Sequence, residues 1–137
     1  AARRSHFIEL LGPALSDGKW IVCDRFSDST LAYQGYGQGM DLAVVRELQS
    51  MVIGEFTPDL TFLLDIPVDE GLMRAGARGA AARYEQMGAD FHCRIRDGFL
   101  EMANAESDRI VVIEGQLSPE IVEAQIRNHI KRHFDLS

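Results

Sequence analysis

The stretch of sequence that decides the fold is WIVCDRFSDSTLAYQG, residues 20–35. Its apolar start, residues 20–23, is typical of a strand that is buried on both faces in a parallel sheet. An acid and a base, Asp24 and Arg25, follow directly. Because ligands of an open α/β sheet lie outside the carboxyl ends of its strands, polar side chains at this point are placed to contact one. The sequence therefore predicts a ligand-binding site directly after residue 23.

Working outward from this stretch, strands and helices alternate along the chain. Two further apolar runs, residues 60–66 and 110–114, are predicted strands. Apolar residues at spacings of three and four predict the helices, which we expect at about 3–15, from 29, 41–54, 70–78, 91–102 and from 118, with a loop at Gly35, Gly37 and Gly39. This order predicts an α/β fold in which helices cover both faces of a parallel sheet. We expect residues 1–137 to form a single domain.

The composition excludes several classes of protein. The chain is 46% hydrophobic and 26% charged, with a net charge of -7, which is typical of a soluble globular domain and argues against a broad nucleic-acid surface. No apolar run approaches the roughly 20 residues that span a bilayer, so we expect no membrane partner. The two cysteines, Cys23 and Cys93, show no metal-site spacing. We expect both to be reduced, as in the cytoplasm, with Cys23 buried.

Arginines stand near the predicted strand ends and helix starts. A guanidinium offers a planar fork of donors that matches phosphate or carboxylate oxygens, so several converging arginines indicate an oxyanion substrate. The alternative is that they are surface residues paired with some of the 21 acids. That alternative is strongest for Arg74 and Arg78, which share one helix face. The candidates are Arg4, Arg25, Arg74, Arg78 and Arg83.

Polar residues around Arg25 complete the candidate site. Asp24 has two interpretations: it coordinates a hydrated Mg²⁺ or it orients Arg25. Ser29, Thr30, Tyr33 and Gln34 either hydrogen-bond a sugar or base, or serve as caps and surface residues. The apolar helix 41–54 either packs into the core or forms a dimer interface.

Taken together, these segments resemble the thymidylate kinase family, in particular bacterial members whose catalytic arginine lies in the lid. The matching segments are residues 1–4, Asp24-Arg25-Phe26, residues 29–35, 58–61, Leu64-Asp65, 74–78, Arg83-Tyr84-Glu85 and the last strand and helix. The resemblance implies a three-layer, P-loop-type nucleoside monophosphate kinase fold. It also implies a transferase that moves the γ-phosphoryl group of ATP to dTMP, giving dTDP for nucleotide biosynthesis. Mg²⁺ would be the cofactor, and the enzyme would be a cytoplasmic homodimer, joined through helix 41–54.

The resemblance also assigns roles to residues. Arg4 would hold the thymine carbonyl, Arg25 the dTMP phosphate and Tyr33 the deoxyribose. Ser29 and Thr30 would line the base pocket, with Gln34 among the substrate-binding residues. Asp24 would lie near Mg²⁺ through water, without a direct metal ligand in the chain. Arg78, Arg74 and Arg83 would act catalytically from a lid at about 74–88, by neutralising charge on the transferred phosphoryl group.

Two departures from the family pattern accompany these assignments. The glycine-rich phosphate loop is not in the sequence, and Gly76 stands where another lid arginine is usual. We therefore expect a longer natural protein, of which this chain is the C-terminal two-thirds, without the first two strands and inactive alone. Two alternatives stay open: another nucleoside monophosphate or deoxynucleoside kinase, and a non-catalytic P-loop-like interaction domain.

Overall fold

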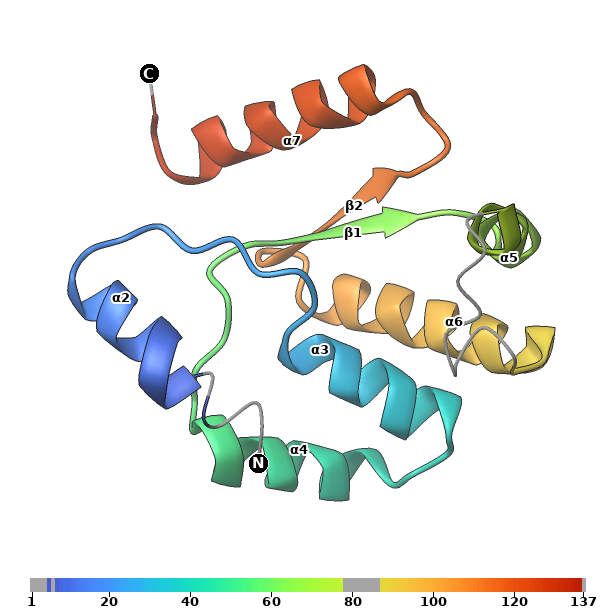
Figure 1. The fold of residues 1–137 in the computed structure, drawn as a ribbon, viewed down its shortest axis with the longest axis horizontal. Helices are drawn as coiled ribbons and strands as arrows, with labels where there is room; N and C mark the ends of the chain where they lie inside the picture. Colours follow the sequence, from blue (N-terminus) through green and yellow to red (C-terminus); the bar gives the residue numbers. More distant parts are fainter. Residues whose placement is uncertain (1–4, 6, 78–86, 137) are drawn as a thin grey trace. The chain divides into compact units, whose positions relative to one another are not determined.

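The computed structural model describes residue 5, residues 7–77 and residues 87–136. Contacts divide the chain into two compact units, Ala1–Thr57 (unit 1) and Pro58–Ser137 (unit 2). The α/β class is confirmed, whereas the single domain stays a prediction. Among the described helices, none is both long and apolar enough to cross a membrane. The elements, in chain order, are η1 (Phe7–Leu11), α2 (Gly12–Ser16), α3 (Ser27–Thr30), η2 (Leu31–Gly37), α4 (Leu42–Ile53), β1 (Thr61–Asp65), α5 (Val68–Ala77), α6 (Ala89–Ala105), β2 (Ile110–Glu114) and α7 (Pro119–His133) (Figure 1).

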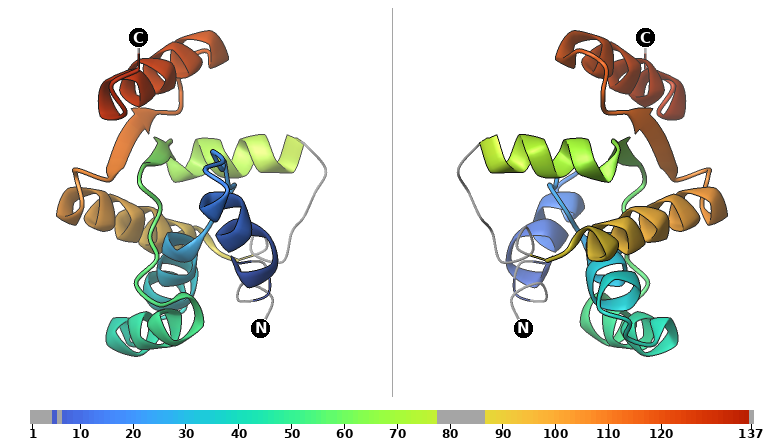
Figure 2. Two further views of the ribbon diagram at one scale, coloured as in Figure 1. Left: turned by 90° about the vertical axis from the view of Figure 1, so that its left-hand side faces the viewer. Right: turned by 90° about the vertical axis from the view of Figure 1, so that its right-hand side faces the viewer.

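Unit 2 is built on a parallel pair of strands, as the sequence predicts. The register runs from Thr61 opposite Ile110 to Asp65 opposite Glu114. Helices α6 and α7 lie on opposite sides of these strands (Figures 1 and 2). Phe62 of β1 meets His129 of α7 with ring centroids 6.3 Å apart. The strands are therefore covered on both faces, which is the layer arrangement expected of apolar parallel strands.

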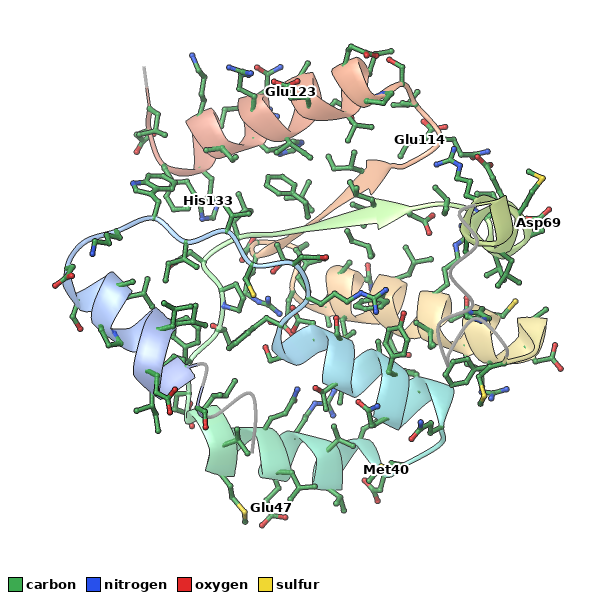
Figure 3. All side chains as sticks on the ribbon, viewed as in Figure 1. Met40, Glu47, Asp69, Glu114, Glu123 and His133 are labelled. Atoms are coloured by element: carbon green, nitrogen blue, oxygen red, sulfur yellow. The ribbon has the colours of Figure 1, made fainter. Side chains whose placement is uncertain are left out.

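Helix α5 lies at the carboxyl end of both strands. It begins at Val68, two residues before the predicted start at residue 70, so Asp69 lies in its first turn. An acidic side chain in a first turn stabilises the positive end of the helix dipole. Figure 3 shows Asp69 on the same side of unit 2 as Glu114, the last residue of β2. Helix α5 therefore borders the carboxyl edge of the two strands of unit 2.

Unit 1 consists of helical segments around a small aromatic core. Leu11, Phe26 and Ile53 are buried together, and Phe26 meets the edge of Phe56 with ring centroids 5.7 Å apart. Helix α4 begins where predicted, because the Asp41 side chain accepts a hydrogen bond from the Ala43 amide at 2.8 Å. Such a cap contributes about 1 kcal/mol. Residues before and after the α3 segment are therefore held against one core.

The prediction of a buried strand at residues 20–23 is wrong. This run is irregular; Trp20 is 66% exposed and Val22 fully exposed, while Ile21 packs on the unit 1 core. Cys23 is exposed, not buried, and both cysteines are free thiols. A strand forms only where a neighbour pairs with its backbone. In the part of the chain that the structure describes, β1 and β2 alone pair in a sheet.

The predicted loop at the spaced glycines is also wrong in part. Gly35 and Gly37 lie in η2, a π-helical segment, and Gly39 turns the chain with a φ of 76°. Glycine inside a helix costs about 1 kcal/mol relative to alanine. Here a Cβ on Gly35 would lie 2.5 Å from Cδ2 of Leu42. Close packing between η2 and α4 therefore favours glycine at this position and offsets its conformational cost.

Candidate functional site

Arg25 has an unusual backbone conformation. Its φ of 62° places it in the left-handed region, and only Asp135 shares this among the described non-glycine residues. The conformation costs an L-residue about 1–2 kcal/mol. Strain of this kind persists where the surrounding structure requires it and gathers at functional sites. The backbone therefore singles out Arg25 independently of its side-chain chemistry.

The Arg25 side chain lies over an aromatic ring. Its guanidinium carbon is 5.1 Å from the centroid of the Tyr33 ring, within the range of a cation–π interaction. The structure thus brings together the two residues that the resemblance assigns to the phosphate and the sugar of one nucleotide. Asp24 is exposed at the bend before Arg25. Among the described side chains, no ion pair joins Asp24 to Arg25.

Other predicted residues turn toward α4. Thr30 and Gln34 line a cavity of about 200 Å³ whose remaining walls are mainly apolar side chains of α4. Gln49 of α4 donates to the backbone carbonyl of Ser27 and so holds the start of α3. Ser29 lies beside them in α3, half-buried. The structure therefore brings Arg25 together with Tyr33, and Thr30 together with Gln34 at the cavity.

Of the predicted catalytic arginines, Arg74 lies in the described part of unit 2. Arg74 of α5 donates to the carbonyl of Gly115 at 3.1 Å and pairs with Glu70 one turn earlier. The ion pair corresponds to the surface alternative weighed for this residue. The contact with Gly115 goes beyond it, because it ties Arg74 to the turn after β2. The catalytic role of Arg74 stays a prediction.

An ion pair that the sequence does not predict lies at the end of β1. Arg96 of α6 donates from Nε and Nη2 to both carboxylate oxygens of Asp65, at 2.7 and 2.8 Å. These hydrogen bonds lower the pKa of Asp65 and raise that of Arg96. In the sequence, Arg96 stands next to the apolar face of α6, and Asp65 is an acid that ends a strand. Neither residue indicates the other in sequence, since 31 positions separate them.

Three predicted residues, Arg4, Arg78 and Arg83, lie outside the described residues, as does most of the predicted lid. Within the ranges 7–77 and 87–136, no three His, Cys, Asp or Glu side chains gather to hold a metal ion. Mg²⁺ commonly needs only one or two carboxylates, with waters and substrate phosphates as the other ligands. The exposed carboxylate of Asp24 fits that requirement through water.

Comparison with known proteins gives consistent results. A family model described as thymidylate kinase matches residues 1–126. The thymidylate kinases of Desulfovibrio desulfuricans and Caulobacter vibrioides are each 43% identical to the chain, over 98% and 99% of it, and each match covers 65% of the relative. The crystal structure of thymidylate kinase from Ehrlichia chaffeensis aligns with a TM-score of 0.69 and 34% identity, over 93% of this chain and 58% of that one. The chain thus spans about 65% of the length of these curated relatives.

Proposed function

Because the chain belongs to the thymidylate kinase family, we propose that its protein transfers the γ-phosphoryl group of ATP to dTMP, giving dTDP. The fold is that of the nucleoside monophosphate kinases, as the solved relative indicates. The observation that carries the proposal is the strained backbone of Arg25 with its guanidinium held over Tyr33. A fixed guanidinium suits a phosphate, because its planar fork binds two oxygens at once.

The acceptor side of the reaction is assigned to unit 1. Arg25 binds the dTMP phosphate and Tyr33 contacts the deoxyribose, where its ring leaves no room for a 2'-hydroxyl. Ser29, Thr30 and Gln34 contact the base, with Arg4 at the thymine carbonyl. What supports this assignment is that the six residues belong to matched family segments and that Arg25 meets Tyr33.

We assign the neutralisation of negative charge on the phosphates to arginines and to Mg²⁺. Arg78, Arg74 and Arg83 stabilise the transferring phosphoryl group, since phosphoryl transfer asks a protein mainly for positioning and cationic stabilisation. When bound, Mg²⁺ would add to the neutralisation of the nucleotide phosphates, and Asp24 would hold it through water. We place the reaction in the cytoplasm, in keeping with the two free thiols.

The proposal is tested by a panel of nucleoside monophosphates offered with ATP and Mg²⁺ to the complete protein. We expect kcat/KM for dTMP to exceed that for dUMP by about tenfold or more, since a missing methyl group in an apolar pocket costs about 1–3 kcal/mol. Thymidine monophosphate with a ribose should be a poorer substrate than dTMP. A clear preference for dCMP or dUMP would contradict the proposal.

We also propose that two copies of the protein associate through α4. Val44, Leu48 and Met51 are 46%, 50% and 63% exposed. Their spacing puts them on one face of the helix, so they form a continuous apolar strip. A second copy of the same helix offers the same strip, as a twofold interface requires.

Replacing Leu48 by glutamate tests this interface. Burying the new carboxylate would be costly, so the molar mass measured by light scattering should fall from that of a dimer to that of a monomer. Ser50→Glu is the matched control, because Ser50 is exposed on another side of α4. An unmodified protein that is monomeric at micromolar concentration would overturn the dimer proposal.

A further inference from the structure

A chain of polar contacts begins with the ion pair between α6 and β1. The fork of Arg96 meets both oxygens of Asp65, and the two side chains are only 38% and 22% exposed. Bidentate pairing fixes orientation as well as distance, because two parallel donors must face two acceptors. The middle of α6 is therefore held to the carboxyl end of β1 at a defined angle.

The same residue of β1 is bound through its backbone to the turn after β2. The Gly115 amide donates to the Asp65 carbonyl at 2.8 Å. A Cβ on Gly115 would lie 2.6 Å from Cγ2 of Ile66 and 3.0 Å from the Asp65 oxygen. The turn therefore packs directly against β1, with no side chain between the two backbones. Because of this contact, a shift of Asp65 would also move Gly115.

The turn after β2 also holds α5. Arg74 donates to the Gly115 carbonyl at 3.1 Å and pairs with Glu70. The second carboxylate oxygen of Glu70 accepts from Nε2 of Gln116 at 2.7 Å. Arg74 is therefore held from the turn both directly and through Glu70. We refer to Arg96, Asp65, Gly115 and Arg74 together as the clasp.

We propose that Asp65 and Arg96 are positioning residues that set the location of the Arg74 guanidinium through the clasp. This inference rests on the proposed function, in which Arg74 stabilises the transferring phosphoryl group. Both side-chain oxygens of Asp65 accept hydrogen bonds from Arg96, so Asp65 serves as a structural anion. Neither Asp65 nor Arg96 contacts substrate in this account.

The test compares Arg96→Met and Arg96→Lys with the unmodified complete protein, using ATP, Mg²⁺ and dTMP. Arg96→Met should lower kcat by about tenfold to a hundredfold, the cost of misplacing a catalytic group by about 1 Å. The KM for dTMP should change by less than about twofold, because the acceptor residues lie in unit 1. Arg96→Lys keeps the charge without the fork and should recover kcat only in part.

A second readout does not depend on catalysis. Hydrogen exchange of the peptide covering α5 should be faster in Arg96→Met than in the unmodified protein, because the clasp no longer holds that helix. The matched control is Arg127→Met, which removes the exposed ion pair with Glu123 on α7. It should change neither kcat nor exchange in α5.

The outcomes separate this proposal from the proposed function. Unchanged kcat and unchanged exchange in Arg96→Met would overturn the clasp while leaving dTMP phosphorylation in place. An unmodified protein that does not phosphorylate dTMP would overturn the proposed function, and the exchange measurement would still decide whether Arg96 holds α5. A rise in KM for dTMP with constant kcat would show that Arg96 acts on the acceptor site and would also overturn the proposal.

Discussion

Arg25→Ala is expected to lower kcat/KM for dTMP by about a hundredfold to ten-thousandfold, because two charge-assisted hydrogen bonds worth about 1.5–3 kcal/mol each would be lost. In the proposed function, the guanidinium that lies over Tyr33 binds the dTMP phosphate. Steady-state kinetics on the complete protein would measure the effect. The midpoint of thermal unfolding should stay nearly constant, since alanine at this position carries the same left-handed strain as arginine.

Two further variants sharpen this experiment. Arg25→Gly should lose activity to the same extent but gain about 1 kcal/mol of stability, because glycine adopts a φ of 62° without strain. Arg46→Ala, at an exposed position of α4, removes the same charge away from the site and should leave turnover unchanged. Full activity in Arg25→Ala would mean that the phosphate contact is misassigned.

Gly115→Ala is expected to destabilise the protein by about 1–3 kcal/mol, the usual cost of forcing a methyl group into a packed position. Its Cβ would lie 2.6 Å from Ile66 Cγ2, and no flexible side chain end can absorb the clash with the Asp65 carbonyl oxygen at 3.0 Å. The strands must therefore separate at their carboxyl end. Chemical denaturation monitored by circular dichroism measures the change in the free energy of unfolding.

Gly76→Ala is the matched control for that substitution. Gly76 lies in α5, and a Cβ there would meet nothing within 4 Å. Alanine in an exposed helix is favoured over glycine by about 1 kcal/mol, so this variant should be slightly more stable. If the two variants were equally stable, the turn after β2 would not pack as described.

The predictions that held in the structure depend on local signals. The helix predicted at residues 41–54 and the apolar runs that form β1 and β2 can each be recognised from residues within one helix or strand. The pairing of β1 with β2 follows because apolar parallel strands have to bury both faces. Arg25 was singled out by a local signal as well, a base directly after an apolar run, and its role in phosphate binding stays a prediction.

The predictions that failed depend on partners distant in sequence. An apolar run such as residues 20–23 has the composition of a strand, yet whether it becomes one depends on a neighbouring backbone. Likewise, the spaced glycines predict a loop at Gly35, because the sequence does not show that Leu42 packs against this position. The ion pair of Asp65 and Arg96 also depends on residues distant in sequence, because the fold brings the two charges together and their spacing does not indicate it.

The exposure of Trp20 gives the chain a built-in optical probe. It is the single tryptophan of the sequence, and its indole is largely open to water shortly before Asp24 and Arg25. Indole emission shifts toward shorter wavelength and changes in intensity when protein or ligand replaces the surrounding water. Intrinsic fluorescence therefore reports directly on whatever covers this indole, without any label.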